Sequence, residues 1–336
     1  MNIGLTLHMD ADHISDVVAR YQEQLSLVKQ AEAVGLQCIW LTEHHGQPDS
    51  PIPRPELFIA FAAAQTERIQ FGTGALLLGQ RSAWEIAEII ATLAVLAPGR
   101  IKIGLAKGGP FVAHQQIWAE SEQRGARFLA ALPQLHNWLQ GRAAPLQADT
   151  APIELVPYCA ALTNLPIYLA SRAPEVIKAA AHYGYGLMVA QFWPISSIIA
   201  VMAQYTALAG QAPRLMVSRG IYIHNDPEIA RQRALAHIEQ VRRRKKHAKR
   251  GTLDLSSETT QLTPHNMPEP ITADNIDQFA LIGCPKTIQR HIEFYRALGI
   301  CDLSLSPLTD NTSERHDQIT RIGALLAACP KSSYAA

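Results

Sequence analysis

The chain has 336 residues, of which 48% are hydrophobic and 18% are charged, the usual balance of a globular enzyme. Its net charge of +1 gives no reason to expect a nucleic acid or an anionic membrane as a partner. The five cysteines are scattered without a Cys-x-x-Cys spacing, which argues against disulfides and a zinc site and fits a reducing cytoplasm. The N-terminus lacks the basic flank of a signal peptide, and no run of about 18 uncharged apolar residues predicts a membrane span.

Strand-like and helix-like segments alternate along the chain, with a fairly regular step. The expected strands span residues 3–7, 38–42, 69–73, 101–105, 166–170, 186–190, 215–224 and 302–305. The expected helices span residues 14–34, 56–65, 83–96, 120–139, 174–183, 195–208, 227–250, 285–298 and 313–327.

Eight strands with helices between them predict an α/β chain that forms one closed (β/α)8 TIM barrel over residues 1–336. An open doubly wound sheet is the alternative, which the absence of a Gly-x-Gly-x-x-Gly motif after the first strand weakens. Two insertions are expected: an excursion at 141–157, rich in proline, and a long mobile loop at 251–272.

The strand expected at 38–42 ends in an acid and two histidines, Glu43, His44 and His45, followed by a proline-rich loop. Its four apolar residues, 38–41, predict a strand buried on both faces. Polar groups that follow a parallel strand face the mouth of the barrel, where ligands bind. The histidine pair alone is equally consistent with a loop cap without catalytic function.

The ends of the other strands bring further candidates to the same mouth. These are His8 after the first strand, Thr73, Gly74 and Ala75 after the third, Ala106 and Lys107 after the fourth, Ser171, Arg172 and Ala173 after the fifth, and Gln191 and Trp193 after the sixth. Proline at position 174 predicts a helix start whose free N–H groups attract a phosphate, to which Arg172 and Lys107 would add charge. A plain N-cap by Ser171 is the alternative.

Gly74 and Ala75 leave nothing bulky at the end of the third strand, so a flat ring can lie against the backbone there. A barrel bulge without a ligand is the alternative interpretation. A phosphate site, a small-residue platform and aromatic groups at one mouth together suit flavin mononucleotide (FMN) better than a sugar or a simple acid.

Five segments, in the same order along the chain, strongly resemble the bacterial luciferase-like flavin-dependent monooxygenases, especially the luciferase α-chain. They are GLQCIWLTEHH (35–45), RIQFGTGALLL (68–78), LAPGRIKIGLAKG (96–108), PIYLASRAPEVIKAAAHYGYGLM (166–188) and ALIGCPKTIQRHIEFYRALGI (280–300). The resemblance implies a (β/α)8 barrel, in agreement with the strand count. It also implies reduced FMN from a separate flavin reductase, reaction with O2 to a C4a-peroxyflavin, and insertion of one oxygen atom into an aldehyde, ketone or similar small organic substrate.

The resemblance also assigns roles to single residues. His44 matches the catalytic histidine, which acts as a base, and Glu43 and His45 flank it as groups that would fix its tautomer. Residues 74–75 match the bulge under the flavin ring. Lys107, Arg172 and Ala173 match positions near the phosphate. His8 and Trp193 remain candidates for the pocket wall. Gln191, Thr73, Ala106 and Ser171 are candidates for binding the cofactor.

The chain departs from the luciferase pattern at three places, which argue against light emission on a long-chain aldehyde. Ala106 replaces a reactive cysteine, Ser82-Ala83 replaces a His-Pro pair, and Pro110 stands where a tyrosine is found. The resemblance makes a homodimer the default and places a mobile lid at 251–272. Two other readings stay open: an F420-dependent hydride-transfer enzyme, and a non-catalytic flavin-binding subunit.

Overall fold

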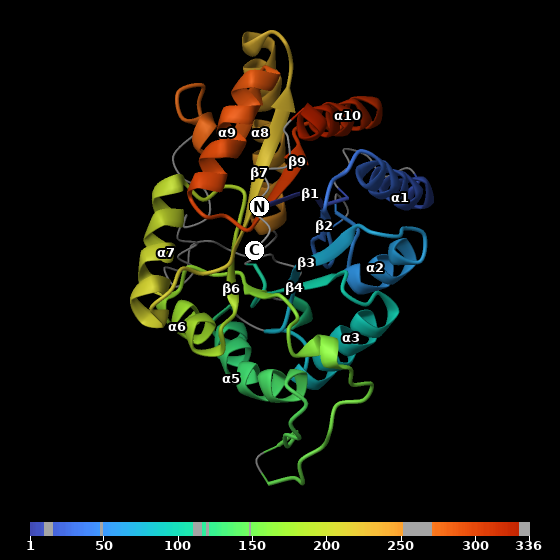
Figure 1. The fold of residues 1–336 in the computed structure, drawn as a ribbon, viewed down its shortest axis with the longest axis vertical. Coiled ribbons are helices and arrows are strands. Elements are labelled where there is room, and N and C mark those ends of the chain that lie inside the picture. Colours follow the sequence, from blue (N-terminus) through green and yellow to red (C-terminus); the bar gives the residue numbers. More distant parts are fainter. Residues whose placement is uncertain are drawn as a thin grey trace.

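The computed structural model shows a closed barrel of parallel strands surrounded by helices (Figure 1). It describes residues 1–9, 16–47, 50–109, 116–118, 121–147, 149–250 and 271–328. The strands are β1 (Asn2–Leu7), β2 (Cys38–Leu41), β3 (Gln70–Leu76), β4 (Ile101–Leu105), β5 (Ile167–Leu169), β6 (Gly186–Val189), β7 (Leu215–Ile223), β8 (Ala280–Gly283) and β9 (Asp302–Pro307). The predicted (β/α)8 barrel is therefore confirmed.

The barrel closes through β7, which pairs with β6 on one side and β9 on the other. Since β9 also pairs with β1, the ring runs β1-β2-β3-β4-β5-β6-β7-β9. All eight strands of this ring were predicted from the sequence. Strand β8 was not, and it pairs only with the far half of β7, at Gly220–Ile223, beyond the residues that pair with β6.

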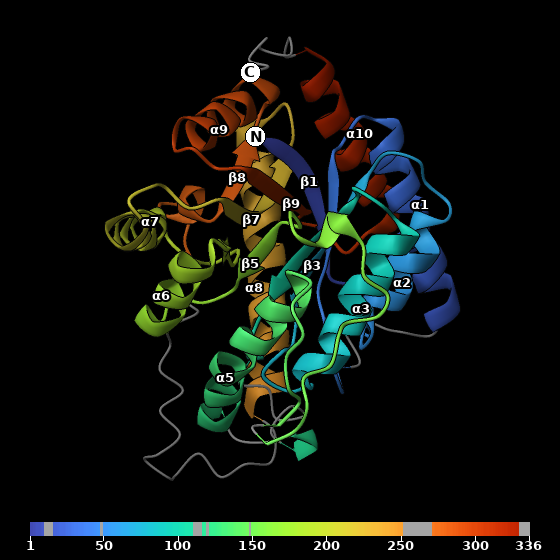
Figure 2. The ribbon, with the colours of Figure 1, turned by 60° about the horizontal axis from the view of Figure 1, so that its bottom comes forward.

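The helices surround the barrel in chain order, with α1 to α3 along one side and α6 and α7 along the other (Figures 1 and 2). They are α1 (Val17–Ala33), α2 (Pro55–Ala63), α3 (Ala83–Leu96), α5 (Ser121–Leu139), α6 (Pro174–Tyr183), α7 (Ile195–Ala209), α8 (Pro227–Arg250), α9 (Pro285–Ala297) and α10 (Thr312–Ala328). Each predicted helix is present. Proline starts α2, α6 and α9, where its missing N–H leaves no helical bond unmade.

The two predicted insertions fare differently. The described part of the excursion at 141–157 is irregular chain with an antiparallel bridge between Ala144 and Ile153. Of the loop predicted at 251–272, residues 251–270 lie outside the described part of the chain.

Large side chains fill the barrel interior because glycines on neighbouring strands make room for them. A Cβ added to Gly72 would lie 2.3 Å from the fully buried Trp40 ring, and one added to Gly104 would lie 2.4 Å from Met188. A polar cluster fills the barrel interior near the amino ends of the strands. The Tyr168 hydroxyl donates to Asp302 at 2.7 Å, and Lys102 donates to the same carboxylate. Burial and the Asp302 charge raise the pKa of Tyr168, so it stays a neutral donor. Open space is therefore left to the other end, the mouth formed by the carboxyl ends of the strands.

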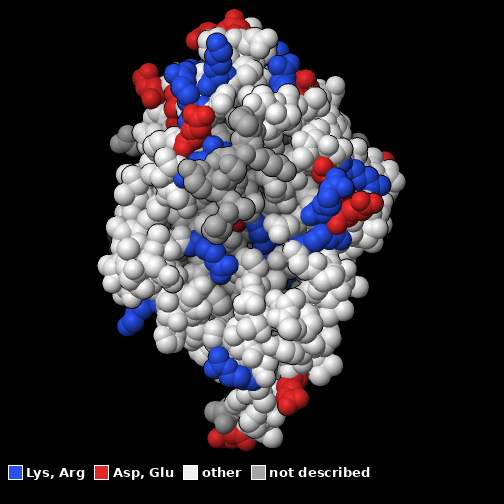
Figure 3. All heavy atoms as spheres, in the orientation of Figure 1, with Lys and Arg blue, Asp and Glu red and all other residues white. Residues whose placement is uncertain are grey.

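The outer surface carries no pronounced charge on the face drawn in Figure 3, where acidic and basic side chains of the described residues form small mixed groups on a mostly uncharged surface. Within the described ranges, none of the helices has the length and apolar character needed to cross a bilayer.

Candidate functional site

Every site residue predicted from the sequence lies at or just past the carboxyl end of one of strands β1 to β6. Because these strands are parallel neighbours in the ring, the structure brings the candidates to one mouth, as predicted. The contacts described below show how each strand end is built.

At the end of β2, the Glu43 side chain is buried and holds His45. Oε1 of Glu43 lies 2.8 Å from Nε2 of His45, and Oε2 accepts from the backbone N–H of Leu77 at 3.1 Å. An ionised carboxylate only accepts, so the bond requires the proton of His45 on Nε2. The His45 ring packs edge to face against Trp118, with centroids 4.6 Å apart. His44 is half-buried, and its backbone N–H donates to the carbonyl of Ile52 at 3.0 Å.

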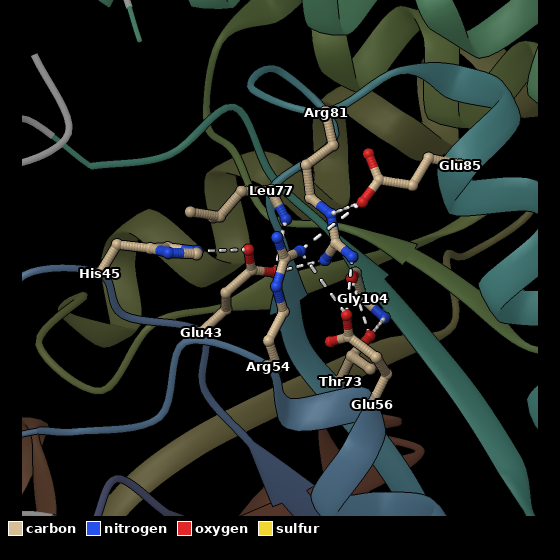
Figure 4. A network of polar contacts seen from close by, with 9 residues as sticks. All are labelled: Glu43, His45, Arg54, Glu56, Thr73, Leu77, Arg81, Glu85 and Gly104. Carbon is tan, nitrogen blue, oxygen red and sulfur yellow. Dashed lines mark hydrogen bonds and ion pairs between the residues drawn. The ribbon is translucent and has the colours of Figure 1, made fainter. Parts of the chain in front are cut away.

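Behind Glu43 lies a network of charged side chains that the sequence did not predict (Figure 4). Arg81 is its centre. Nη2 of Arg81 donates to Glu56 at 2.6 Å, Nε donates to Glu85 at 3.1 Å, and Nη1 lies 3.5 Å from Glu43. Burial alone would lower the pKa of Arg81, but the hydrogen bond to Glu56 and the three carboxylates outweigh it and raise the pKa. A permanent positive charge therefore stands behind the Glu43–His45 pair.

At the end of β3, the backbone forms the predicted small-residue platform. The register between β3 and β4 shifts between Thr73 and Leu76, and the peptide bond between Gly74 and Ala75 is cis. The Thr73 side chain is fully buried, and its hydroxyl donates to the carbonyl of Gly104 and accepts from the N–H of the same residue, both at 2.9 Å. Thr73 thus pins the bulge to β4, while Gly74 and Ala75 form its surface.

The loop after β3 packs closely against the loop after β4. A Cβ added to Gly79 would lie 2.8 Å from the Cα of Lys107, so only glycine allows this approach. The buried side chain of Gln80 lies against Gly108, and its amide has no hydrogen-bond partner among the described residues. Lys107 is exposed. This corner offers a cation and an amide group to a polar ligand.

At the end of β5, the first turn of α6 lacks a side-chain cap. Ala173 is the N-cap residue, and Pro174 follows it. Ser171 accepts from the N–H of Ala173 at 3.1 Å, so Ser171 is not the N-cap of α6. The guanidinium of Arg172 lies over the Trp193 ring, 4.7 Å from its centroid, and burial lowers the pKa of Arg172. The N-terminus of α6 therefore has no side-chain cap, and the nearby Arg172 guanidinium is positioned by the Trp193 ring.

Arg219 of β7 fixes the loop after β6 and was not predicted as a site residue. It is fully buried and donates to the carbonyls of Gln191 at 3.1 Å and Trp193 at 3.0 Å, and to the hydroxyl of Tyr295 at 2.7 Å. Burial lowers the pKa of Arg219, and contact with Tyr295 opposes that effect. The signal available in the sequence was an arginine inside an otherwise apolar strand, LMVSRGIYI.

Sequence comparison finds bacterial relatives of this chain. The Bacillus subtilis protein YwcH is 31% identical over 53% of this chain and 53% of its own length. The N-acetyl-S-alkylcysteine monooxygenase of the same organism is 30% identical over 35% of this chain and 36% of its own. The chain thus spans about half, or less, of these two relatives. The oxygenase component of the flavin-dependent trigonelline monooxygenase of Acinetobacter baylyi is 22% identical over 94% of this chain and 91% of its own.

Solved structures share the fold at low identity. Monooxygenase RslO1 from Streptomyces bottropensis superposes with a TM-score of 0.81 at 20% identity, covering 97% of this chain and 99% of that one. The oxygenating constituent of 3,6-diketocamphane monooxygenase from Pseudomonas putida, in complex with FMN, superposes with a TM-score of 0.72 at 18% identity, and 96% of both chains is covered. An F420-dependent secondary alcohol dehydrogenase gives 0.72 at 16%, covering 97% and 98%. The description of the luciferase-like monooxygenase family matches residues 1–301, and the chain therefore belongs to that family of enzymes.

Proposed function

We propose that this enzyme is a monooxygenase that uses reduced FMN and O2 to place one oxygen atom in a small organic substrate. In that reaction the reduced flavin supplies two electrons, one oxygen atom enters the substrate and the other leaves as water. The observation that carries the proposal is the bulge at residues 74–75, a flat platform in the same mouth as an uncapped helix N-terminus.

The residues at the mouth fit FMN in both its parts. The ring would lie on Gly74 and Ala75, next to Ala106. The phosphate would meet the N-terminus of α6, where orphan N–H groups and the helix dipole favour an anion. Arg172 and Lys107 would supply charge there, together with the backbone around Ser171 and Ala173.

His44 is the proposed general base, with Glu43 and His45 holding the strand end in place. A histidine in this position would accept a proton at an imidazole nitrogen during oxygen transfer to the substrate, for which the bound flavin would supply the oxygen chemistry. The bond between His45 and Glu43 engages the side chain of His45 in holding the end of the strand. The packed rim of the mouth would exclude water from the reacting oxygen.

The same proposal includes a separate flavin reductase and a homodimer that works in the cytoplasm. The name "oxygenase component" of the Acinetobacter relative supports the separate reductase. Exposed apolar side chains on neighbouring helices α2 and α3 support a dimer; they are Leu57, Phe61, Val95 and Leu96.

A second candidate is hydride transfer with the deazaflavin F420. The similarity in fold to an F420-dependent secondary alcohol dehydrogenase favours it. A relative from Kineococcus radiotolerans, an F420-dependent glucose-6-phosphate dehydrogenase, is 30% identical over 47% of this chain and 49% of its own.

Anaerobic titration with reduced and oxidised FMN, followed by rapid mixing with O2, tests the proposal. Preferential binding of the reduced form, with substrate-dependent O2 consumption that yields no extra peroxide, is the expected result. Failure of both FMN forms to bind, with binding of F420 in their place, would favour hydride transfer. O2 consumption that no substrate alters would favour a non-catalytic flavin-binding subunit.

The variant His44→Ala tests the assigned base. It should bind FMN as the parent enzyme does and lose most product formation, because the platform and the phosphate groups remain. Near-normal product yield in this variant would remove His44 from the mechanism.

A further inference from the structure

A pocket opens in the part of the mouth that the proposed flavin site leaves open. The platform and the phosphate groups lie at the ends of β3, β4 and β5. The pocket lies across the ring, between the ends of β1 and β9 and the loop after β6, with α8 forming one wall. The empty space between its side chains, part of it open to solvent, is about 660 Å³. Strand β2, which carries His44, lies between β1 and β3, so His44 stands where the two regions meet.

The charged side chains that line this pocket already have ionic partners. Nδ1 of His237 lies 3.6 Å from Oδ2 of Asp310. Arg315 contacts Glu23 at 2.8 Å and donates to the carbonyl of Thr309 at 3.2 Å. Among the described lining residues, therefore, Arg315 is engaged in an ion pair, and Asp310 is engaged in one when His237 is protonated. A charged ligand would lose its hydration here without gaining an unengaged counter-ion.

Uncharged polar side chains also line this space, and Ser306 and Gln191 are two of them. The hydroxyl of Ser306, at the end of β9, belongs to a residue only 7% exposed and has no hydrogen-bond partner among the described residues. The amide of Gln191 reaches over the end of β7 because Gly220 has no side chain; a Cβ there would lie 3.0 Å from Nε2 of Gln191. A buried hydroxyl without a partner costs free energy unless a ligand supplies one.

Much of the remaining wall is apolar, although Thr6, His8, Gln24 and Thr309 also line the pocket. Met9 follows β1, Phe192 follows Gln191, Leu308 follows β9, and Ile238 comes from α8. All four are buried side chains that favour contact with hydrocarbon. Such a wall with a few placed polar groups is the usual composition of a site for a small organic molecule.

We propose that this pocket binds the substrate, and that the substrate is a neutral, mainly hydrocarbon molecule with one oxygen held by Ser306 and Gln191. The pocket selects against carboxylates and ammonium ions of the same shape. The substrate assignment rests on the proposed function, because the pocket is defined as the region that faces the flavin platform across His44. Gln191, expected from the sequence to bind the cofactor, is here assigned to the substrate.

The test compares three probes that share one ring: cyclohexanone, cyclohexanecarboxylate and cyclohexylammonium. Their dissociation constants are measured by saturation-transfer NMR on the full chain without flavin, so the result does not depend on turnover. Cyclohexanone should bind at least ten-fold more tightly than either ion. Equal or tighter binding of an ion, or saturable binding of none of the probes, would overturn the proposal.

Three variants locate the binding. Ser306→Ala should weaken the binding of cyclohexanone several-fold. Ser218→Ala, which alters another buried serine outside the pocket wall, should leave that binding unchanged. Val241→Trp, at a half-buried position of α8 that lines the pocket, should prevent the binding of cyclohexanone. An unchanged cyclohexanone affinity in both Ser306→Ala and Val241→Trp would refute the location.

FMN binding is measured in parallel on the same samples. Loss of probe binding in Val241→Trp with FMN affinity intact supports the pocket as a separate site. If FMN fails to bind the parent enzyme while the probe pattern holds, the proposed cofactor fails and the neutral-ligand pocket stands.

Discussion

Replacing Arg81 by methionine should strongly destabilise the enzyme. Arg81 is buried and lies within 2.6, 3.1 and 3.5 Å of Glu56, Glu85 and Glu43. Methionine fills much of the same volume but leaves two buried carboxylates, Glu43 and Glu56, without their guanidinium. Breaking a buried ion pair in this way costs about 3–5 kcal/mol, because each remaining carboxylate loses its buried cation in a site with little access to water.

The second arginine of the network supplies the matched control. Arg54 lies 3.8 Å from Glu56 and 3.6 Å from Glu85, but its side chain is 46% exposed. Exposed ion pairs contribute about 0–1 kcal/mol, so Arg54→Met should cost no more than that. Arg81→Lys keeps the charge but loses the forked donor geometry of the guanidinium. Its loss of unfolding free energy should therefore lie between those of Arg81→Met and Arg54→Met.

The measurement is the free energy of unfolding from urea titrations of the three variants at neutral pH. The pKa of Arg81 is raised, so its stabilising charge is present at every pH below its ordinary pKa and is lost only as the pH rises through the raised value. The reasoning is wrong if Arg81→Met lies within 1 kcal/mol of the parent enzyme, or if Arg54→Met costs as much. A double variant with Glu43→Gln should recover part of the loss, since it removes one uncompensated charge.

Three further predictions concern other parts of the fold. Gly72→Ala places a methyl group 2.3 Å from the Trp40 ring and should cost about 1–3 kcal/mol in urea unfolding, with a change in tryptophan fluorescence. Arg219→Met should loosen the loop at 191–193 and lower FMN affinity, and it should cost about 1–3 kcal/mol for each buried carbonyl left without its donor. Burial alone would raise the pKa of Glu314, but hydrogen bonds from two hydroxyls and a guanidinium lower it below its ordinary 4.5. Its stabilising effect should therefore be complete above pH 4.5 and fade as the pH falls through the lowered pKa, and Glu314→Gln should flatten that acid decline.

The ring strands were predictable because each is a short apolar run bounded by turn residues, and the mouth followed because parallel strands place their carboxyl ends together. Strand β8 was missed because it pairs only with the far half of β7, a pairing that no local pattern encodes. The rim residues were predictable one strand at a time.

The charged network behind Glu43 was not predictable, because its members come from β2, α2 and the start of α3. Sequence spacing gives no sign that Glu56 and Arg81 meet. The partners of Arg219 were not predictable either. Its position in a strand was evident, but its carbonyl partners lie in a loop that only the folded chain brings near.

The far half of β7 has a consequence for how this enzyme can change. Beyond the ring, β7 pairs with β8 and supports a second, smaller apolar core that is separate from the main one. It includes Tyr222, Ala234, Phe279 and Ile282, together with Phe192 and Leu308 of the pocket wall. The small core thus supports one wall of the pocket, while the barrel sheet carries the proposed flavin platform. Because the small core is separate from the main one, substitutions there should alter the proposed ligand preference with less effect on the barrel sheet that carries the proposed flavin platform.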